Sequence, residues 1–116
     1  MRREFRLTRS TDFKRVRRFG KSFAHPLIVL VALTSENGKT RIAVSAGRSV
    51  GGAVQRNRAK RLIREAIRPL LPGIPSGWNM VILSRHGLAQ ASFQETQAAL
   101  QVLLRRARLL NSVSAR

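Results

Sequence analysis

Apolar residues along the chain fall into short blocks whose spacing predicts strands. Residues 27–33 form a continuous run rich in β-branched side chains, bounded by a proline and by a polar turn, which indicates a largely buried strand. Residues 41–46 alternate between apolar and other side chains, as a half-buried strand does. Because Asn37 and Gly38 lie between these runs, an antiparallel hairpin is the simplest connection. Residues 79–83 predict a further short strand.

Three other segments have the features of helices. Residues 8–19 are predicted to form the first helix. Ser10 or Thr11 can serve as its N-cap, and Gly20 follows its last residue, where helices often end. Residues 53–68 are strongly periodic and should end at Pro69, followed by a loop over residues 69–77. A Ser-x-x-Glu capping box predicts a last helix over residues 92–108.

The order of these segments defines the expected fold class. Helix, two or three strands, helix, strand and helix follow one another, which is typical of an α+β fold with helices packed on a small mixed sheet. A chain of 116 residues supports one modest core. We therefore expect a single domain over residues 1–110 and a frayed tail over residues 111–116.

The periodic segment 53–68 separates apolar from basic side chains. On a helical wheel the side expected to face the sheet carries Ala59, Leu62, Ile63 and Ala66. Basic and amide side chains gather away from it and are named here the basic stripe: Arg56, Asn57, Arg58, Lys60, Arg61, Arg64 and Arg68. An ordinary solvated face is the simpler explanation of most charge runs, but such faces usually mix charges of both signs. We therefore interpret the stripe as a contact surface for a polyanion.

The composition strengthens this interpretation. Lys and Arg number 23 against 5 Asp and Glu, a formal charge of +18, and 43% of the residues are hydrophobic. The charge therefore belongs to a folded body, and the arginine-rich excess suits phosphate groups. The absence of cysteine and the shortness of the apolar run at residues 27–33 fit a cytoplasmic protein with no membrane partner.

Candidate catalytic groups are few and scattered. His25 and His86 read as loop residues, where surface or structural roles are commoner than catalysis. The chain has five side-chain carboxylates, and no two of them are spaced like the ligands of one metal ion. They are Glu4, Asp12, Glu36, Glu65 and Glu95. We predict no catalytic residue, no metal site and no cofactor bound by the protein alone.

Two motifs make a family resemblance specific. Residues 51–65 read Gly-Gly-Ala-Val-Gln-Arg-Asn-Arg-Ala-Lys-Arg-Leu-Ile-Arg-Glu, with an Arg-Asn-Arg core followed by Lys-Arg-x-x-Arg. Residues 12–22 carry Asp-Phe-x-x-Val-x-x-x-Gly-Lys-Ser. Both patterns, their separation and the chain length resemble the bacterial ribonuclease P protein component family.

The resemblance implies a function and the residues that serve it. The protein would be the subunit of an endoribonuclease that removes the 5′ leader of precursor tRNA, with catalysis by the RNA subunit and magnesium. The basic stripe would bind the catalytic RNA. A cleft formed by the first helix and the strand beginning at Leu27 would hold the leader through Phe13 and Val16; Arg17 and Val31 stand where the family often has aromatic residues. The resemblance also implies a split βαβ unit with a left-handed crossover.

Other classes remain as alternatives at this stage. A ribosomal RNA-binding structural protein without processing activity shares the size, charge and lack of catalytic groups, and only the two motifs separate it. A DNA-binding regulator is disfavoured because the basic helix lies between strands instead of following another helix closely. A self-sufficient nuclease is the least favoured. We therefore expect ribonuclease P RNA and precursor tRNA as partners, and no DNA.

Overall fold

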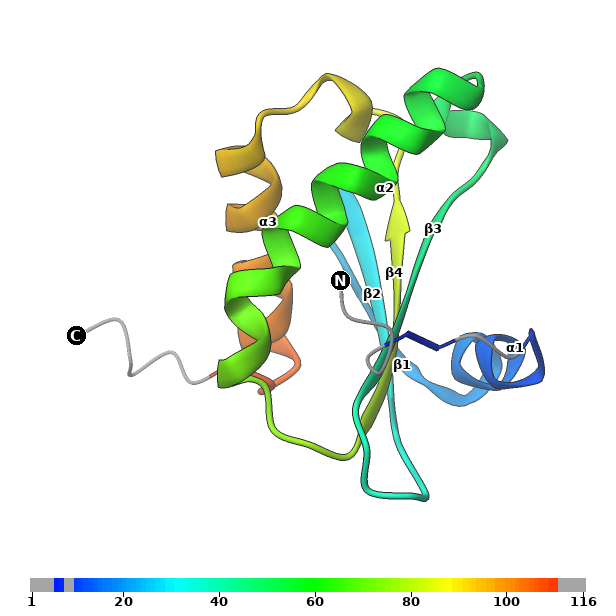
Figure 1. Ribbon diagram of the computed structural model, residues 1–116, viewed down its shortest axis with the longest axis vertical. Helices are drawn as coiled ribbons and strands as arrows, with labels where there is room; N and C mark the ends of the chain where they lie inside the picture. Colours follow the sequence, from blue (N-terminus) through cyan, green and yellow to red (C-terminus); the bar gives the residue numbers. More distant parts are fainter. Residues whose placement is uncertain (1–5, 8–9, 111–116) are drawn as a thin grey trace.

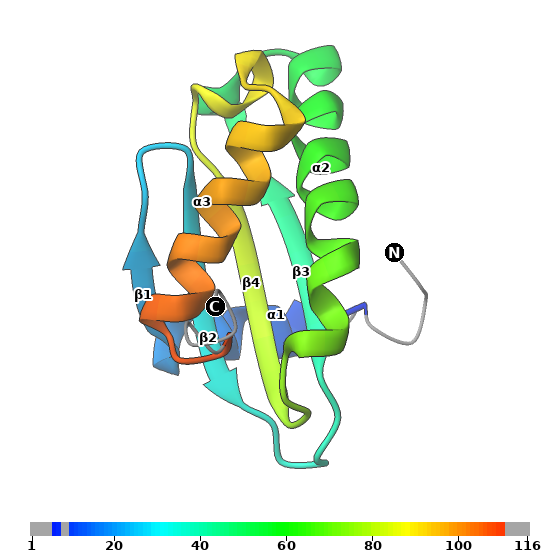
Figure 2. The ribbon, with the colours of Figure 1, turned by 90° about the vertical axis from the view of Figure 1, so that its left-hand side faces the viewer.

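The computed structural model describes residues 6–7 and 10–110, and a four-stranded mixed sheet forms its central layer (Figure 1). Two helices, α2 (Ala53–Ile67) and α3 (Phe93–Arg106), lie side by side over one face of the sheet (Figure 2). The helix α1 (Ser10–Phe19) lies on the opposite face. The predicted α+β class is therefore confirmed, whereas the tail at residues 111–116 and the predicted start of the first helix at Thr8 fall outside the described residues.

The sheet contains β1 (Lys21–Ala24), β2 (Ile28–Thr34), β3 (Arg41–Ala46) and β4 (Trp78–Ser84) in the order β1-β2-β4-β3. The predicted hairpin between residues 27–33 and 41–46 is wrong, because β4 lies between β2 and β3 and pairs with both. A strand that is apolar on both faces favours an interior position with a neighbour on each side. The hairpin partner of β2 is the short strand β1.

The connection through α2 links two parallel strands that are direct neighbours. β3 and β4 pair from Arg41–Asn79 to Ala46–Ser84, so no strand separates them. A split βαβ unit would have another strand between its two parallel strands. Because β3 pairs directly with β4, the expectation of a split unit is wrong. The left-handed sense of the crossover stays a prediction.

Local signals placed most helix ends correctly. The capping box at the start of α3 is present, with the Glu95 amide donating to Ser92 Oγ at 3.0 Å and the Ser92 amide donating to Glu95 Oε1 at 2.8 Å. α2 ends at Ile67, close to the predicted limit. The chain then continues as a 3₁₀ helix, η3 (Arg68–Gly73), so the loop expected at residues 69–77 is partly helical. Pro69 fits this first turn because the amide it lacks would have no helical partner there.

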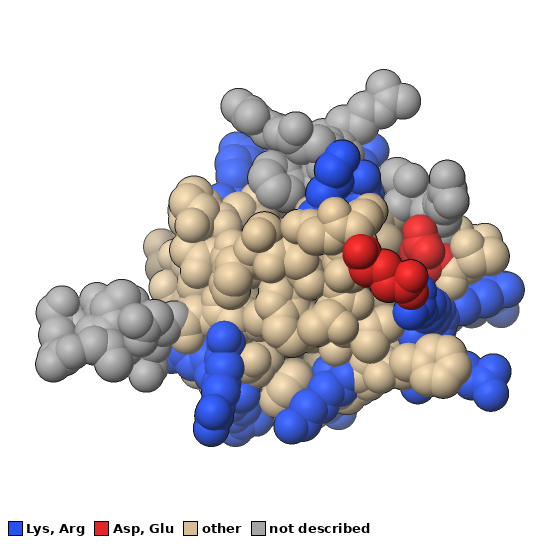
Figure 3. All heavy atoms as spheres, turned by 90° about the horizontal axis from the view of Figure 1, so that it is seen from below, with Lys and Arg blue, Asp and Glu red and all other residues tan. Residues whose placement is uncertain are grey.

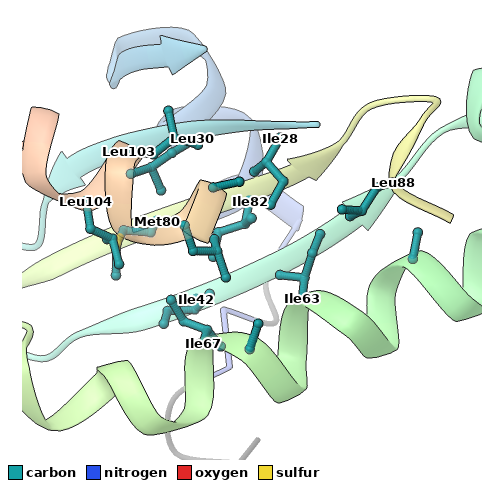
Figure 4. Close-up of a cluster of buried hydrophobic side chains, with 14 of the residues drawn as sticks. Ile28, Leu30, Ile42, Ile63, Ile67, Met80, Ile82, Leu88, Leu103 and Leu104 are labelled. Carbon is teal, nitrogen blue, oxygen red and sulfur yellow. The ribbon is translucent and has the colours of Figure 1, made fainter. Parts of the chain in front are cut away.

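The sheet separates two apolar clusters. The larger fills the space between the sheet and the pair α2 and α3, and Figure 4 shows its side chains interleaving from all these elements. The smaller lies under α1 and contains Leu7, Val16, Val31 and Val81. The helical wheel was nearly right for α2: Ala59, Ile63 and Ala66 are buried, but Leu62 is half-buried and Ile67 takes its place in the core.

Gly20 joins α1 to β1 at a point of close contact. A Cβ atom at this position would lie 2.5 Å from the Val16 carbonyl oxygen, 2.8 Å from Val31 Cγ1 and 2.9 Å from the Ala32 carbonyl oxygen. Two of these neighbours are backbone atoms, which cannot move aside without shifting α1 or β2. A side chain is therefore excluded by space.

We expect Gly20→Ala to lower the free energy of unfolding by about 1–3 kcal/mol, because the added methyl group overpacks the junction of α1 with the sheet. Thermal and urea unfolding of the variant would measure the loss. Gly47→Ala is the matched control, because a Cβ atom there meets nothing within 4 Å and φ is −83°. Equal stability of the two variants would contradict the proposed close contact at Gly20.

Candidate nucleic-acid interface

The basic stripe lies on the side of α2 that faces away from the core. Asn57, Arg58, Arg61 and Arg68 are exposed, and Arg56, Lys60 and Arg64 are half-buried. The helix itself is held in place by four buried side chains on its other side: Ala59, Ile63, Ala66 and Ile67. The predicted stripe therefore exists as one surface on a fixed helix, and Arg68 extends it into the start of η3.

The two flanks of the stripe meet different parts of the molecule. The half-buried residues follow one another at intervals of four, which places them along one side of the helix. Arg64 reaches the edge strand β3, where it lines a pocket together with Ala43 and Ser45. On the other flank, α2 packs against α3, and Gln97 Nε2 donates to the Ala66 carbonyl oxygen at 3.2 Å.

Arg58 is the stripe residue that the fold itself uses. Its Nε donates a hydrogen bond of 2.7 Å to the Ala89 carbonyl oxygen in the short 3₁₀ helix η4 (Leu88–Gln90). This bond ties α2 to the segment that follows β4. The sequence does not predict this bond, because nothing local in it indicates a partner 31 residues away.

The residues predicted for a cleft on α1 divide into accessible and buried ones. Phe13 is half-buried and Arg17 is exposed, four residues apart and therefore neighbours on the helix surface. Val16 is 1% exposed and Val31 is 2% exposed, and both belong to the cluster that holds α1 on the sheet. Val16 and Val31 are therefore buried between α1 and the sheet, and their direct contact with a ligand stays a prediction.

The same face of the sheet offers apolar side chains that sequence reasoning missed. Val29, Ala43 and Leu83 are half-buried and pack against the cluster under α1. The alternation of a strand gave a usable signal, since residues 29, 31 and 33 must share a face of β2. What the pattern could not reveal is how much of that face α1 covers.

On the face of the molecule drawn in Figure 3, basic side chains are more widespread than acidic ones. From the lower end of the molecule in Figure 1, the acidic side chains in view gather at one place beside basic ones, whereas Lys and Arg occupy several other sides (Figure 3). An ion pair joins Glu36 to Arg15 across the β2–β3 loop and α1. Asp12, Glu65 and Glu95 are the other acidic residues in the described part of the chain, so most of its positive charge has no acidic counterpart.

The described residues contain no group of three or more His, Cys, Asp or Glu side chains arranged to hold a metal ion. His25 has a structural contact: its Nδ1 accepts a hydrogen bond of 3.1 Å from the Leu27 amide in the turn between β1 and β2. His86 is exposed in the segment after β4. In the described ranges, none of the helices has the length and apolar character required to cross a membrane.

A small α+β body with a stripe of basic side chains on one fixed helix defines a class, that of basic proteins that bind nucleic acid. The sequence matches the family model described as Ribonuclease P over residues 1–108, and the chain belongs to this family. A ribonuclease P protein component from Chloroflexus aurantiacus is 42% identical over 111 residues, covering 95% of this chain and 82% of the relative.

Solved structures agree with this assignment. The ribonuclease P protein of Staphylococcus aureus superposes with a TM-score of 0.82 at 25% identity, covering 92% of this chain and 98% of the other. The ribonuclease P protein of Thermotoga maritima gives a TM-score of 0.75 at 28% identity, covering 90% of this chain and 97% of the other. The likeness extends over the sheet and the helices and is not confined to the two motifs.

Proposed function

We propose that the chain is the protein subunit of a ribonuclease P ribonucleoprotein, that the basic stripe binds the catalytic RNA, and that the α1 side of the sheet binds the 5′ leader of precursor tRNA. The observation that carries this proposal is the basic stripe. It presents Arg61 and Arg68 to solvent from a helix whose other side is anchored in the core. Because the helix backbone is already fixed, only the arginine side chains have to be ordered when they bind phosphates.

The stripe residues are assigned different roles. Arg56, Asn57, Lys60 and Arg61 contact RNA directly, and Asn57 adds donors and an acceptor for a ribose or base edge. Arg58 has its Nε engaged with Ala89, so it holds α2 in position and leaves its terminal nitrogens for RNA. Arg68 continues the contact surface at the end of the helix.

The leader contact is assigned to Phe13 and Arg17. A half-buried aromatic ring offers one face for stacking on an unpaired base, and the exposed guanidinium four residues later can bind the adjoining phosphate. Val16 and Val31 support this surface from below by keeping α1 on the sheet. The half-buried side chains Val29 and Leu83 extend the apolar floor.

Cleavage itself is assigned to the RNA subunit with magnesium ions, in the cytoplasm. The protein contributes binding: its cations neutralise phosphates where catalytic RNA and precursor tRNA meet, which lowers the magnesium concentration that the assembly requires. By holding the leader, the protein also favours precursor tRNA over mature tRNA.

We expect Phe13→Ala to weaken binding of a long-leader precursor to the holoenzyme by about tenfold, because one base loses its stacking partner. Affinity for mature tRNA, which lacks the leader, should stay unchanged. Equilibrium binding of both RNAs to reconstituted holoenzyme measures this. Phe13→Leu is the control for packing, since it retains an apolar side chain and removes the aromatic face. Loss of affinity for precursor and mature tRNA alike would contradict the leader assignment.

A further inference from the structure

A pocket of about 260 Å³ lies at the edge of the sheet, between the two surfaces assigned above. α1 contributes Phe13 to its lining and α2 contributes Arg64. Residues 42–45 of the edge strand β3 form the wall that connects them, and Arg6 and Leu7 also line the pocket. The N-terminal residues Arg6 and Leu7, α1, β3 and α2 therefore meet at one concave site.

Backbone contacts fix the two cationic positions of this pocket. Arg6 forms a parallel bridge with Ile42, and the Leu7 amide donates to the Ile42 carbonyl oxygen at 2.8 Å. Leu7 is 8% exposed and packs in the cluster under α1. Arg64 follows Ile63, which is fully buried in the larger core. Both arginines thus project from backbone that the fold holds in place.

The charge of the pocket is unbalanced. Arg6 is exposed and Arg64 is half-buried, and neither side chain has a hydrogen-bond or ion-pair partner among the described residues. None of the described residues that line the pocket is acidic. Two guanidinium groups at one concave site repel each other unless an anion lies between them, and their geometry suits the oxygens of a phosphate.

The β3 edge adds backbone groups that a nucleotide can use. The Ile42 carbonyl oxygen points to this edge, where it accepts from Leu7, so Val44 two residues later directs its amide and carbonyl to the same side. Within the described chain, no backbone group pairs with Val44 on that side. Ser45 supplies a hydroxyl group to the same lining.

The size and openness of the pocket select the kind of ligand. Its volume is below the range of about 300–1,000 Å³ that is usual for complete small-molecule sites, and it is open to solvent. It therefore suits one unit of a longer chain better than an enclosed small molecule. A half-buried phenylalanine beside two arginines is the combination that binds unpaired nucleotides.

We propose that this pocket holds one nucleotide of single-stranded RNA, with its phosphate between Arg6 and Arg64 and its sugar or base against Phe13. The inference rests on the proposed function and deepens it, because the pocket makes the path from the leader surface on α1 to the helix α2 continuous. It also moves Arg64 from the catalytic RNA to the precursor strand, in contrast to Arg61 and Arg68.

The test uses holoenzyme reconstituted with a bacterial ribonuclease P RNA and precursor tRNAs that carry one uncharged methylphosphonate at successive leader linkages. With the unaltered protein, one linkage should weaken precursor binding by about tenfold, because its phosphate loses a charged contact. With Arg64→Gln or Arg6→Gln the same linkage should have a smaller effect, and with both substitutions together it should have no further effect, since both partners are then absent. The slope of log affinity against log salt should also fall by about one for each arginine.

The controls separate this inference from the proposed function. Arg105→Gln removes one exposed charge from α3 and should leave the methylphosphonate pattern intact. Affinity for mature tRNA should not change in Arg64→Gln. If leader length affects binding but no linkage couples to Arg6 or Arg64, or if Arg64→Gln weakens mature tRNA equally, the pocket assignment is wrong. If the protein confers no dependence on the leader at all, the proposed function fails as well.

Discussion

Replacing Arg56, Arg61 and Arg68 together by glutamine is expected to weaken binding of the chain to ribonuclease P RNA by about 10²- to 10³-fold, through the loss of three phosphate contacts. Arg61 and Arg68 are exposed and Arg56 is half-buried, so none of the three is part of the core. Glutamine retains helix propensity close to that of arginine. The fold should therefore survive while the binding is lost.

Titration of labelled RNA at fixed salt measures the affinity, and circular dichroism with thermal unfolding checks the fold. The matched control is the triple variant Lys39→Gln, Arg85→Gln and Arg105→Gln, which removes the same charge from exposed sites outside the stripe. The salt dependence of the stripe variant should fall by about 2–3 in the slope of log affinity against log salt. Equal weakening by both triple variants would show that overall charge, and not the stripe, binds the RNA.

The parts of the fold that were predictable from sequence are those fixed by neighbours along the chain. The helix over residues 53–67, the capping box at Ser92 and the strand at residues 27–33 follow from local periodicity and side-chain chemistry. The family could be predicted from the sequence because both motifs, residues 51–65 and residues 12–22, are formed by residues close together along the chain. Periodicity also separates the basic and buried sides of α2, apart from the exchange of Leu62 for Ile67.

Pairing between distant strands was not predictable in the same way. Asn37 and Gly38 are typical of a two-residue hairpin, yet β4, more than 30 residues further along the chain, takes the place beside β2. The pairing with β4 helps to bury β2 on both faces. This burial cannot be predicted from the residues near the turn, because β4 lies far along the chain. The short strand β1 has a largely exposed pattern, so it gave almost no signal.

Accessibility also had to come from the structure. A resemblance assigns roles to positions, but it does not show that Val16 and Val31 are buried between α1 and the sheet or that Arg58 bonds to Ala89. The pocket at the β3 edge depends on the meeting of Arg6, Phe13 and Arg64, which lie on three separate segments. These features are products of tertiary packing.

The largest expected effect is on cleavage. The purified chain should cut no precursor tRNA by itself, because the proposed function assigns cleavage to the RNA subunit with magnesium ions. Mixed with ribonuclease P RNA, it should restore removal of the 5′ leader at a magnesium concentration too low for the RNA alone. The physical reason is that its cations replace part of the counterion charge needed where the two RNAs meet.

A cleavage time course with RNA alone, protein alone and both together at low magnesium is the most direct measurement of this division of labour. We predict accurate 5′ processing in the mixture and none with either component by itself. Cleavage of precursor tRNA by the protein without RNA, abolished by Glu65→Gln or His86→Ala, would contradict the assignment of the chemistry to the RNA subunit.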